Sequence, residues 1–174
     1  ITNKKSKNSR NIFIKNPFEK LNKFSSVYRK SLDCNNIAIT GSAGKTSVKD
    51  LTGFCLNKLD KTYYSKNSFN NKYGVPLSII NSPQSTKFSV LEVGMDKKGE
   101  IDVLTKLIRP NLGLITNISY AHIKNFRNLD EIAKAKGEII NNIFPSGVMI
   151  INKDDKYCDY FLSKAKMRNL NLIT

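Results

Sequence analysis

The sequence has few of the features that mark secreted, membrane-spanning or repetitive proteins. Its three cysteines, Cys34, Cys55 and Cys158, are odd in number and show no C-x-x-C spacing. This usage is typical of reduced thiols and predicts a cytoplasmic protein. No apolar run approaches the length of a membrane span and no signal-peptide segment is present, so we expect no membrane insertion. No internal repeat or low-complexity linker is evident.

Acidic residues are also scarce. The chain has 14 Asp and Glu against 29 Lys and Arg, a net charge of +15. A basic nucleic-acid-binding module is therefore one alternative, but the lysines are scattered and no binding motif or interleaved aromatic is present, so we do not expect nucleic acid as a partner. The length of 174 residues allows one domain with a sizeable core. The first residue is Ile1, which indicates a fragment or a processed product.

The stretch with the clearest chemistry is residues 40–46, TGSAGKT. The apolar run 37–39 before it is typical of a buried strand, and residues 47–59 after it carry Val48, Leu51, Phe54 and Leu59 at helical spacing. A strand, a Gly-containing loop and a helix N-terminus form a phosphate cradle, because the first helical turn leaves backbone N–H groups unpaired. The expected contacts with a nucleoside triphosphate are Thr40, Gly41, Ser42, Ala43, Gly44, Lys45, Thr46 and Ser47.

Two residues of this loop have more specific expected roles. Lys45 can reach the β- and γ-phosphates, and the Thr46 hydroxyl can ligate Mg²⁺. The motif is a variant, because the usual first glycine position holds Ile39 and the glycine lies at Gly41 instead. A plain turn with a chance Gly-Lys-Thr stays open as an alternative, but the flanking strand and helix favour a nucleotide site.

Two ionisable residues lie at or just after the carboxyl ends of further predicted strands. Glu92 lies in the apolar strand 88–93, where a carboxylate could hold Mg²⁺ opposite the phosphate loop. His122, the only histidine, follows the strand 112–116 on the expected ligand side. The alternatives are an edge carboxylate without function and a histidine that binds nothing.

Lys136 lies within the apolar stripe of the predicted helix 129–143, unlike Lys134. Burial lowers the pKa of a lysine and provides a neutral amine for chemistry. The alternative is a side chain that extends its ammonium to solvent.

The alternation of strands and helices predicts an α/β fold, a doubly wound and mostly parallel sheet with a P-loop and with ligands at the carboxyl ends of its strands. The other expected strands are 11–15, 61–65, 147–152 and 170–174, and the other expected helices are 18–30, 76–80, 99–108 and 154–167, the last capped by Asp154 and Asp155.

Five segments occur in the order found in one enzyme family. They are ITGSAGKT (39–46), NSFNNKYGVPL (67–77), LEVGM (91–95), TNISYAH (116–122) and AKAKGEI (133–139). Together they resemble the central ATP-binding domain of the Mur ligases. The forms NNxxGVPL and EVGM resemble the branch of that family that joins D-alanyl-D-alanine to UDP-N-acetylmuramoyl-tripeptide.

The resemblance implies ATP-dependent amide bond formation through an acyl phosphate, in peptidoglycan synthesis, with ATP and Mg²⁺ as cofactors. Glu92 and His122 would ligate Mg²⁺, as would Thr46, and Lys136 would match the lysine that the family carries as a carbamate, a further metal ligand. Asn70, Asn71 and Asn117 would lie in loops toward the substrates.

The family's domain plan implies how the chain is divided. Residues 1–35 would be the end of an N-terminal UDP-binding domain with its connecting helix, and 36–174 an incomplete central domain. The full-length enzyme is expected to be a monomer, and this chain alone to bind nucleotide weakly and catalyse nothing. Another amide ligase of the superfamily, of the folylpolyglutamate or cyanophycin synthetase type, stays open as an alternative.

Overall fold

A computed structural model describes residues 13–120 and 125–174, and in these residues six parallel strands form one sheet in the order β2-β3-β1-β4-β5-β6. The strands are β1 (Asn35–Thr40), β2 (Thr62–Tyr64), β3 (Phe88–Glu92), β4 (Leu112–Ile115), β5 (Val148–Ile151) and β6 (Asn171–Ile173). The helices are α1 (Pro17–Ser31), α2 (Lys45–Leu56), α3 (Gly74–Ile80), α4 (Glu100–Ile108), α5 (Leu129–Lys136), the 3₁₀ helix η2 (Gly137–Asn142) and α6 (Cys158–Lys166).

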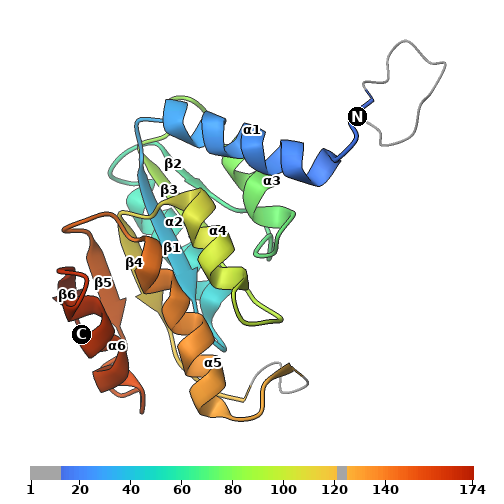
Figure 1. Cartoon of the computed structure of the whole chain (residues 1–174). Helices are drawn as coiled ribbons and strands as arrows, with labels where there is room; N and C mark the ends of the chain where they lie inside the picture. The colour runs from blue at the N-terminus through green and yellow to red at the C-terminus, as the bar shows by residue number, and fades with distance from the viewer. Residues whose placement is uncertain (1–12, 121–124) are drawn as a thin grey trace.

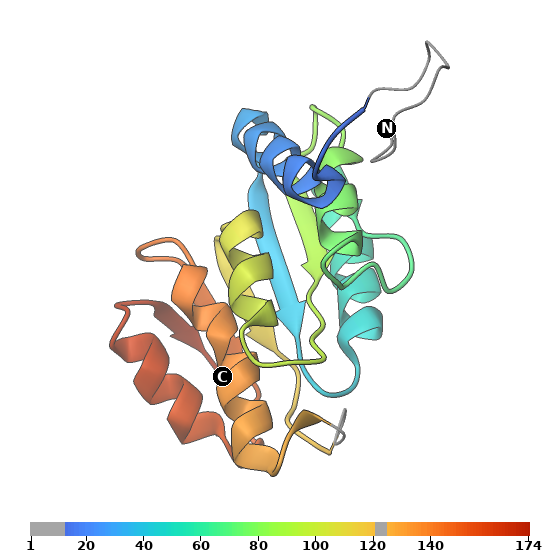
Figure 2. The ribbon, with the colours of Figure 1, turned by 45° about the vertical axis from the view of Figure 1, so that its right-hand side comes forward.

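The helices are divided unequally between the two faces of the sheet. Helix α2 lies behind the sheet in Figure 1, against β1, β2 and β3, whereas α1, α3, α4 and α5 lie along the opposite face (Figures 1 and 2). The chain therefore leaves β1 toward one face and leaves its neighbours β3 and β4 toward the other. Loops that diverge in this way open a crevice at the carboxyl ends of the strands, which is where doubly wound sheets bind ligands.

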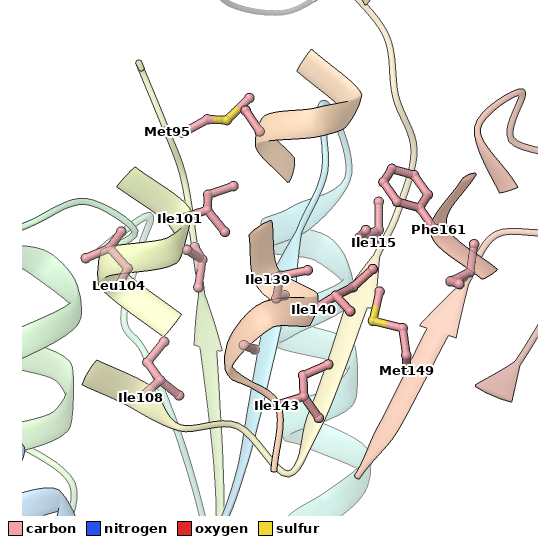
Figure 3. Close-up of a cluster of buried hydrophobic side chains, with 14 of the residues drawn as sticks. Met95, Ile101, Leu104, Ile108, Ile115, Ile139, Ile140, Ile143, Met149 and Phe161 are labelled. Carbon is pink, nitrogen blue, oxygen red and sulfur yellow. The ribbon is translucent and has the colours of Figure 1, made fainter. Parts of the chain in front are cut away.

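The main core lies between the sheet and the row of helices on the face opposite α2. Ala38, Leu91, Ile115 and Met149 point to this side from four neighbouring strands, because alternate residues of a strand face opposite sides. Figure 3 shows Ile115 and Met149 of this set beside residues from the helices and from the end of η2, namely Ile101, Leu104, Ile108, Ile139, Ile140, Ile143 and Phe161. A smaller cluster of Ile37, Ile39 and Val90 on the other side packs against α2.

Helix α2 buries a different face from the one that its apolar spacing suggests. Val48 packs against the smaller cluster, but Leu51 and Phe54 are 65% and 57% exposed, whereas Lys49 and Gly53 are buried. Leu59 lies beyond the end of the helix and is 77% exposed. Gly53 is the reason for close packing here, since a Cβ on it would lie 2.5 Å from the ring of Tyr64 in β2.

Three predicted elements differ from the structure. Helix 129–143 divides into α5 and η2, the change falling at Gly137, a residue that weakens an α-helix. Helix 154–167 begins only at Cys158, because the Asp155 carboxylate accepts a hydrogen bond from Tyr157 N within the preceding turn and another from Ile118 N in the loop after β4. Of the predicted strand 11–15, the described part contains no strand, only an isolated bridge at Phe13.

The other elements are confirmed with ends shifted by up to three residues. None of the described helices is both long and apolar enough to span a bilayer. The predicted doubly wound α/β architecture is confirmed, and the sheet is entirely parallel in the described residues.

Candidate active site

The loop between β1 and α2 depends on two glycines with positive φ. Gly41 has φ +149°, and a Cβ on it would lie 1.8 Å from Thr116 Oγ1. Gly44 has φ +77° and stands at the N-cap of α2, where a left-handed residue without side-chain cap leaves the helix end open. The glycines let the loop turn tightly against β4.

The first turn of α2 offers donors to an anion. The helical hydrogen-bond ladder begins with Val48 N donating to Gly44 O at 2.9 Å. The N–H groups of Lys45, Thr46 and Ser47 precede this bond and lack intrahelical acceptors, as at every helix N-terminus. Backbone donors and the positive end of the helix dipole therefore converge where a phosphate would bind.

Two lysines from distant parts of the chain meet at the carbonyl of Gly41. Lys45 Nζ donates to Gly41 O at 2.9 Å and to Ser42 O at 3.2 Å, and Lys136 Nζ donates to Gly41 O at 2.8 Å. Lys136 is only 2% exposed, and burial, with a smaller effect of the Lys45 charge, lowers its pKa from 10.5 to about 7. Lys134 is exposed, so the burial predicted for Lys136 and not for Lys134 is confirmed.

Glu92 lies at the end of β3 beside the start of α2. It is 1% exposed, and its two oxygens accept hydrogen bonds of 2.7 Å from Thr46 Oγ1 and from Asn70 Nδ2. Neither of the two ion pairs found in the described residues involves Glu92. A buried carboxylate without a cationic partner is costly, so its environment favours a bound cation.

The residues present fit a magnesium ion that takes two oxygen ligands from the protein and the others from phosphates and water. Thr46 Oγ1 and Glu92 Oε2 are 2.7 Å apart, close to the separation of about 2.9 Å between adjacent oxygens of an octahedron with bonds of about 2.05 Å. The described residues contain no cluster of three or more His, Cys, Asp or Glu side chains suited to a metal. Proteins usually contribute only a few oxygen ligands to a Mg²⁺–nucleotide site, and phosphate oxygens and water complete the coordination.

The loop after β4 is fastened to the phosphate loop. Asn117 accepts from Ser42 N with its carbonyl and from Ala43 N with its side chain, at 2.9 and 3.0 Å. Thr116 Oγ1 donates to Ala43 O at 2.6 Å. Asn117 therefore acts as a structural support of the phosphate loop, and the site includes Thr116, which the sequence did not single out.

The other residues predicted for the site differ in burial and in the contacts they make. Thr40 is buried at the end of β1, and its hydroxyl has no hydrogen-bond partner in the part of the chain that the structure describes. Ser47 is exposed on α2. Asn71 Oδ1 accepts from Tyr73 N and Gly74 N, in the turn that leads into α3, whose N-cap residue is Tyr73. His122 lies outside the described residues.

A cavity of about 720 Å³ extends from the phosphate loop. Lys45 and Lys136 line one part of it, and Asn70, Asn71 and Tyr73 line another. Most of the other lining residues belong to the segment 94–104, so the cavity lies between the phosphate loop and the start of α4.

A parallel α/β sheet with a lysine-bearing phosphate loop and an acidic strand end is typical, as a class, of proteins that bind a nucleoside triphosphate. The sequence profile of the Mur ligase middle domain matches residues 39–174. The chain belongs to the Mur ligase family, and its fold is that of the family's central domain.

Relatives and solved structures agree with this placement. The UDP-N-acetylmuramoyl-tripeptide–D-alanyl-D-alanine ligase of Buchnera aphidicola subsp. Baizongia pistaciae is 38% identical over 84% of this chain and 32% of its own length. MurF of Acinetobacter baumannii has a TM-score of 0.87 at 30% identity, covering 93% of this chain and 36% of that chain. MurF of Thermotoga maritima, solved in complex with ADP, has a TM-score of 0.83 at 25% identity, covering 98% and 39%.

The chain spans about a third of the length of the curated relatives it matches. The activity, substrates and partners of the whole relatives therefore apply here only as proposals.

Proposed function

We propose that this chain is the ATP-binding part of a ligase that joins D-alanyl-D-alanine to UDP-N-acetylmuramoyl-tripeptide in peptidoglycan synthesis. The observation that carries the proposal is the buried Glu92 carboxylate, hydrogen-bonded to Thr46 at 2.7 Å beside the phosphate loop and without an ionic partner among residues 13–120 and 125–174. The names of the relatives supply the substrates. Residues 36–174 would be the central domain, and 1–35 the end of the preceding domain.

The reaction would proceed in two substitutions. An oxygen of the tripeptide carboxylate attacks the γ-phosphorus of ATP, and ADP leaves with the electron pair of the broken P–O bond. The amine of D-alanyl-D-alanine then attacks the acyl carbon, phosphate leaves, and the amine loses its proton as the amide forms. Bound Mg²⁺ would neutralise charge on the phosphate oxygens.

The residues of this chain would hold and orient the nucleotide. Lys45 would exchange its bonds to Gly41 O and Ser42 O for the β- and γ-phosphates, and the first N–H groups of α2 would bind phosphate oxygens. Glu92 and Thr46 would supply two oxygens to the metal, and Asn70 would keep the Glu92 carboxylate in place by its 2.7 Å hydrogen bond. His122 stays a prediction as the ligand of a second Mg²⁺.

Lys136 would carry the carbamate that the family resemblance implies. Its near-complete burial and its pKa of about 7 leave a large fraction of neutral amine at neutral pH, which is the form that adds CO₂. The added carboxylate would convert a cation into an oxygen ligand for a hard metal.

The test is a product assay on the full-length protein that contains this chain. With Mg·ATP, UDP-N-acetylmuramoyl-tripeptide and D-alanyl-D-alanine, we expect ADP, phosphate and a product whose mass equals the two substrates less water. A substrate panel with folate plus glutamate tests the superfamily alternative. Turnover only in that panel would overturn the proposed substrates, and the absence of nucleotide binding would overturn the site.

A further inference from the structure

Lys49 is a fully buried lysine that the proposed chemistry does not use. It lies one turn after Lys45 on α2, is 0% exposed, and is among the largest side chains that the fold buries completely. A lysine is seldom buried without partners, because removal of its charge from water is costly.

All three N–H donors of this ammonium have acceptors. Nζ donates to Ser65 O at 2.5 Å and to Asn67 O at 2.9 Å, and it lies 3.0 Å from Asp50 Oδ1. The carboxylate of Asp50 is half exposed, so it balances the charge while remaining solvated. This complete set of partners explains how the cation is tolerated, and it fixes the backbone of residues 65–67 against α2.

Residues 65–70, which we name the 65–70 loop, connect this anchor to the proposed metal site. Ser68 Oγ lies 3.4 Å from Thr46 Oγ1, and Asn70 Nδ2 donates to Glu92 Oε1 at 2.7 Å. Asn67, whose carbonyl Lys49 holds, has φ +51°, a conformation that costs a non-glycine residue free energy. The 65–70 loop thus reaches both proposed oxygen ligands from a backbone position that the ammonium stabilises.

We propose that Lys49 is a positioning residue for magnesium: by holding the 65–70 loop on α2, it keeps Asn70 and Ser68 where they orient Glu92 and Thr46 for the metal of the nucleotide complex. The inference rests on the proposed function, since it assigns a role at the same site. Lys49 itself touches neither nucleotide nor metal.

The experiment uses the full-length protein that contains this chain and compares its affinity for ADP with and without Mg²⁺, by calorimetric titration in excess Mg²⁺ and in EDTA. The variants are Lys49→Met, which keeps the aliphatic stem, and Lys49→Gln, which keeps a neutral donor and protects the test against failure of the first to fold. The control is Lys58→Met, an exposed lysine of the same region whose ammonium lies over the Phe54 ring.

In wild type, Mg²⁺ should increase the affinity for ADP by a certain factor, and we expect this factor to be about tenfold smaller in the Lys49 variants. A tenfold change is the size of one charged hydrogen-bond interaction. The affinity for ADP in EDTA should stay within about twofold of wild type. Lys58→Met should change neither value. If Lys49 served stability alone, Mg²⁺ would increase the ADP affinity of the folded variant molecules by the same factor as in wild type. That result would overturn the proposal.

A double-mutant cycle with Asn70→Ala tests the route. If Lys49 acts through the 65–70 loop, the double variant will lose less of the Mg²⁺-dependent gain in ADP affinity than the sum of the losses in Lys49→Gln and Asn70→Ala, expressed as free energies. Additive effects would overturn the route. Failure of the full-length wild-type protein to bind ADP under any condition would instead overturn the proposed function, so the two failures are distinguishable.

Discussion

The stability of the fold should depend on pH through Lys136, and Lys136→Met should remove that dependence. Burial lowers the pKa of Lys136 from 10.5, its value in an unfolded chain, to about 7. Between these values the unfolded chain binds more protons than the folded one, so the free energy of unfolding rises with pH in this window and is independent of this group below it. At 1.36 kcal/mol per pKa unit, the whole window is worth about 5 kcal/mol, and the part from pH 7 to pH 9 about 2 kcal/mol.

Urea unfolding in CO₂-free buffer at pH 7, 8 and 9 measures this effect. Burial also lowers the pKa of Lys164, so the informative quantity is the difference between wild type and Lys136→Met, in which the contribution of Lys164 cancels. We expect wild type to gain about 2 kcal/mol relative to the variant from pH 7 to pH 9. A constant difference over that range would refute the reasoning, and Lys134→Met, at an exposed position, should behave as wild type.

Three further results follow from the site. Lys45→Ala should weaken ATP binding by about 10- to 100-fold in calorimetry, because it removes a charged donor to phosphate; unchanged affinity with unchanged stability would refute the role of Lys45. Glu92→Gln should raise the Mg²⁺ concentration for half-maximal turnover of the full-length enzyme about tenfold, and an unchanged requirement would exclude Glu92 as a ligand. Gly41→Ala should lower stability by about 1–3 kcal/mol more than Gly44→Ala, since both have positive φ but only the former Cβ would collide, at 1.8 Å from Thr116 Oγ1; equal losses in thermal unfolding would contradict this.

The sequence allowed the order of the elements and much of the site to be predicted, because these depend on local patterns. The phosphate loop is recognisable from contiguous residues, and Glu92 and Lys136 could be found because an ionisable residue interrupts an apolar pattern. The structure brings Lys136 to the phosphate loop, with its Nζ 2.8 Å from Gly41 O, although 95 residues separate the two in the sequence.

The face that α2 buries could not be predicted from its apolar spacing. Of the apolar residues at that spacing, Val48 packs against the core and Leu51 and Phe54 are exposed, whereas Lys49 and Gly53 are buried. The decisive partners are the carbonyls of the 65–70 loop and the ring of Tyr64, and contacts of this kind are set by tertiary packing rather than by periodicity.

The contact between Asp155 and the loop after β4 could not be predicted from the sequence for a similar reason. Asp155 was expected only as a helix cap, yet its carboxylate also accepts from Ile118 N at 2.6 Å, 37 residues away. A short polar residue in a loop has the same local sequence signature whether its partner is near or distant.

The most direct test of the account is where a nucleotide binds. In a ¹⁵N-labelled sample with Mg²⁺, addition of a non-hydrolysable ATP analogue should shift the backbone amide signals of Gly44 to Ser47 and of Glu92 most strongly, and Lys45→Ala should abolish those shifts at the same concentration. Shifts confined to other parts of the chain, or the same shifts in Lys45→Ala, would contradict the claim that this loop is a nucleotide site.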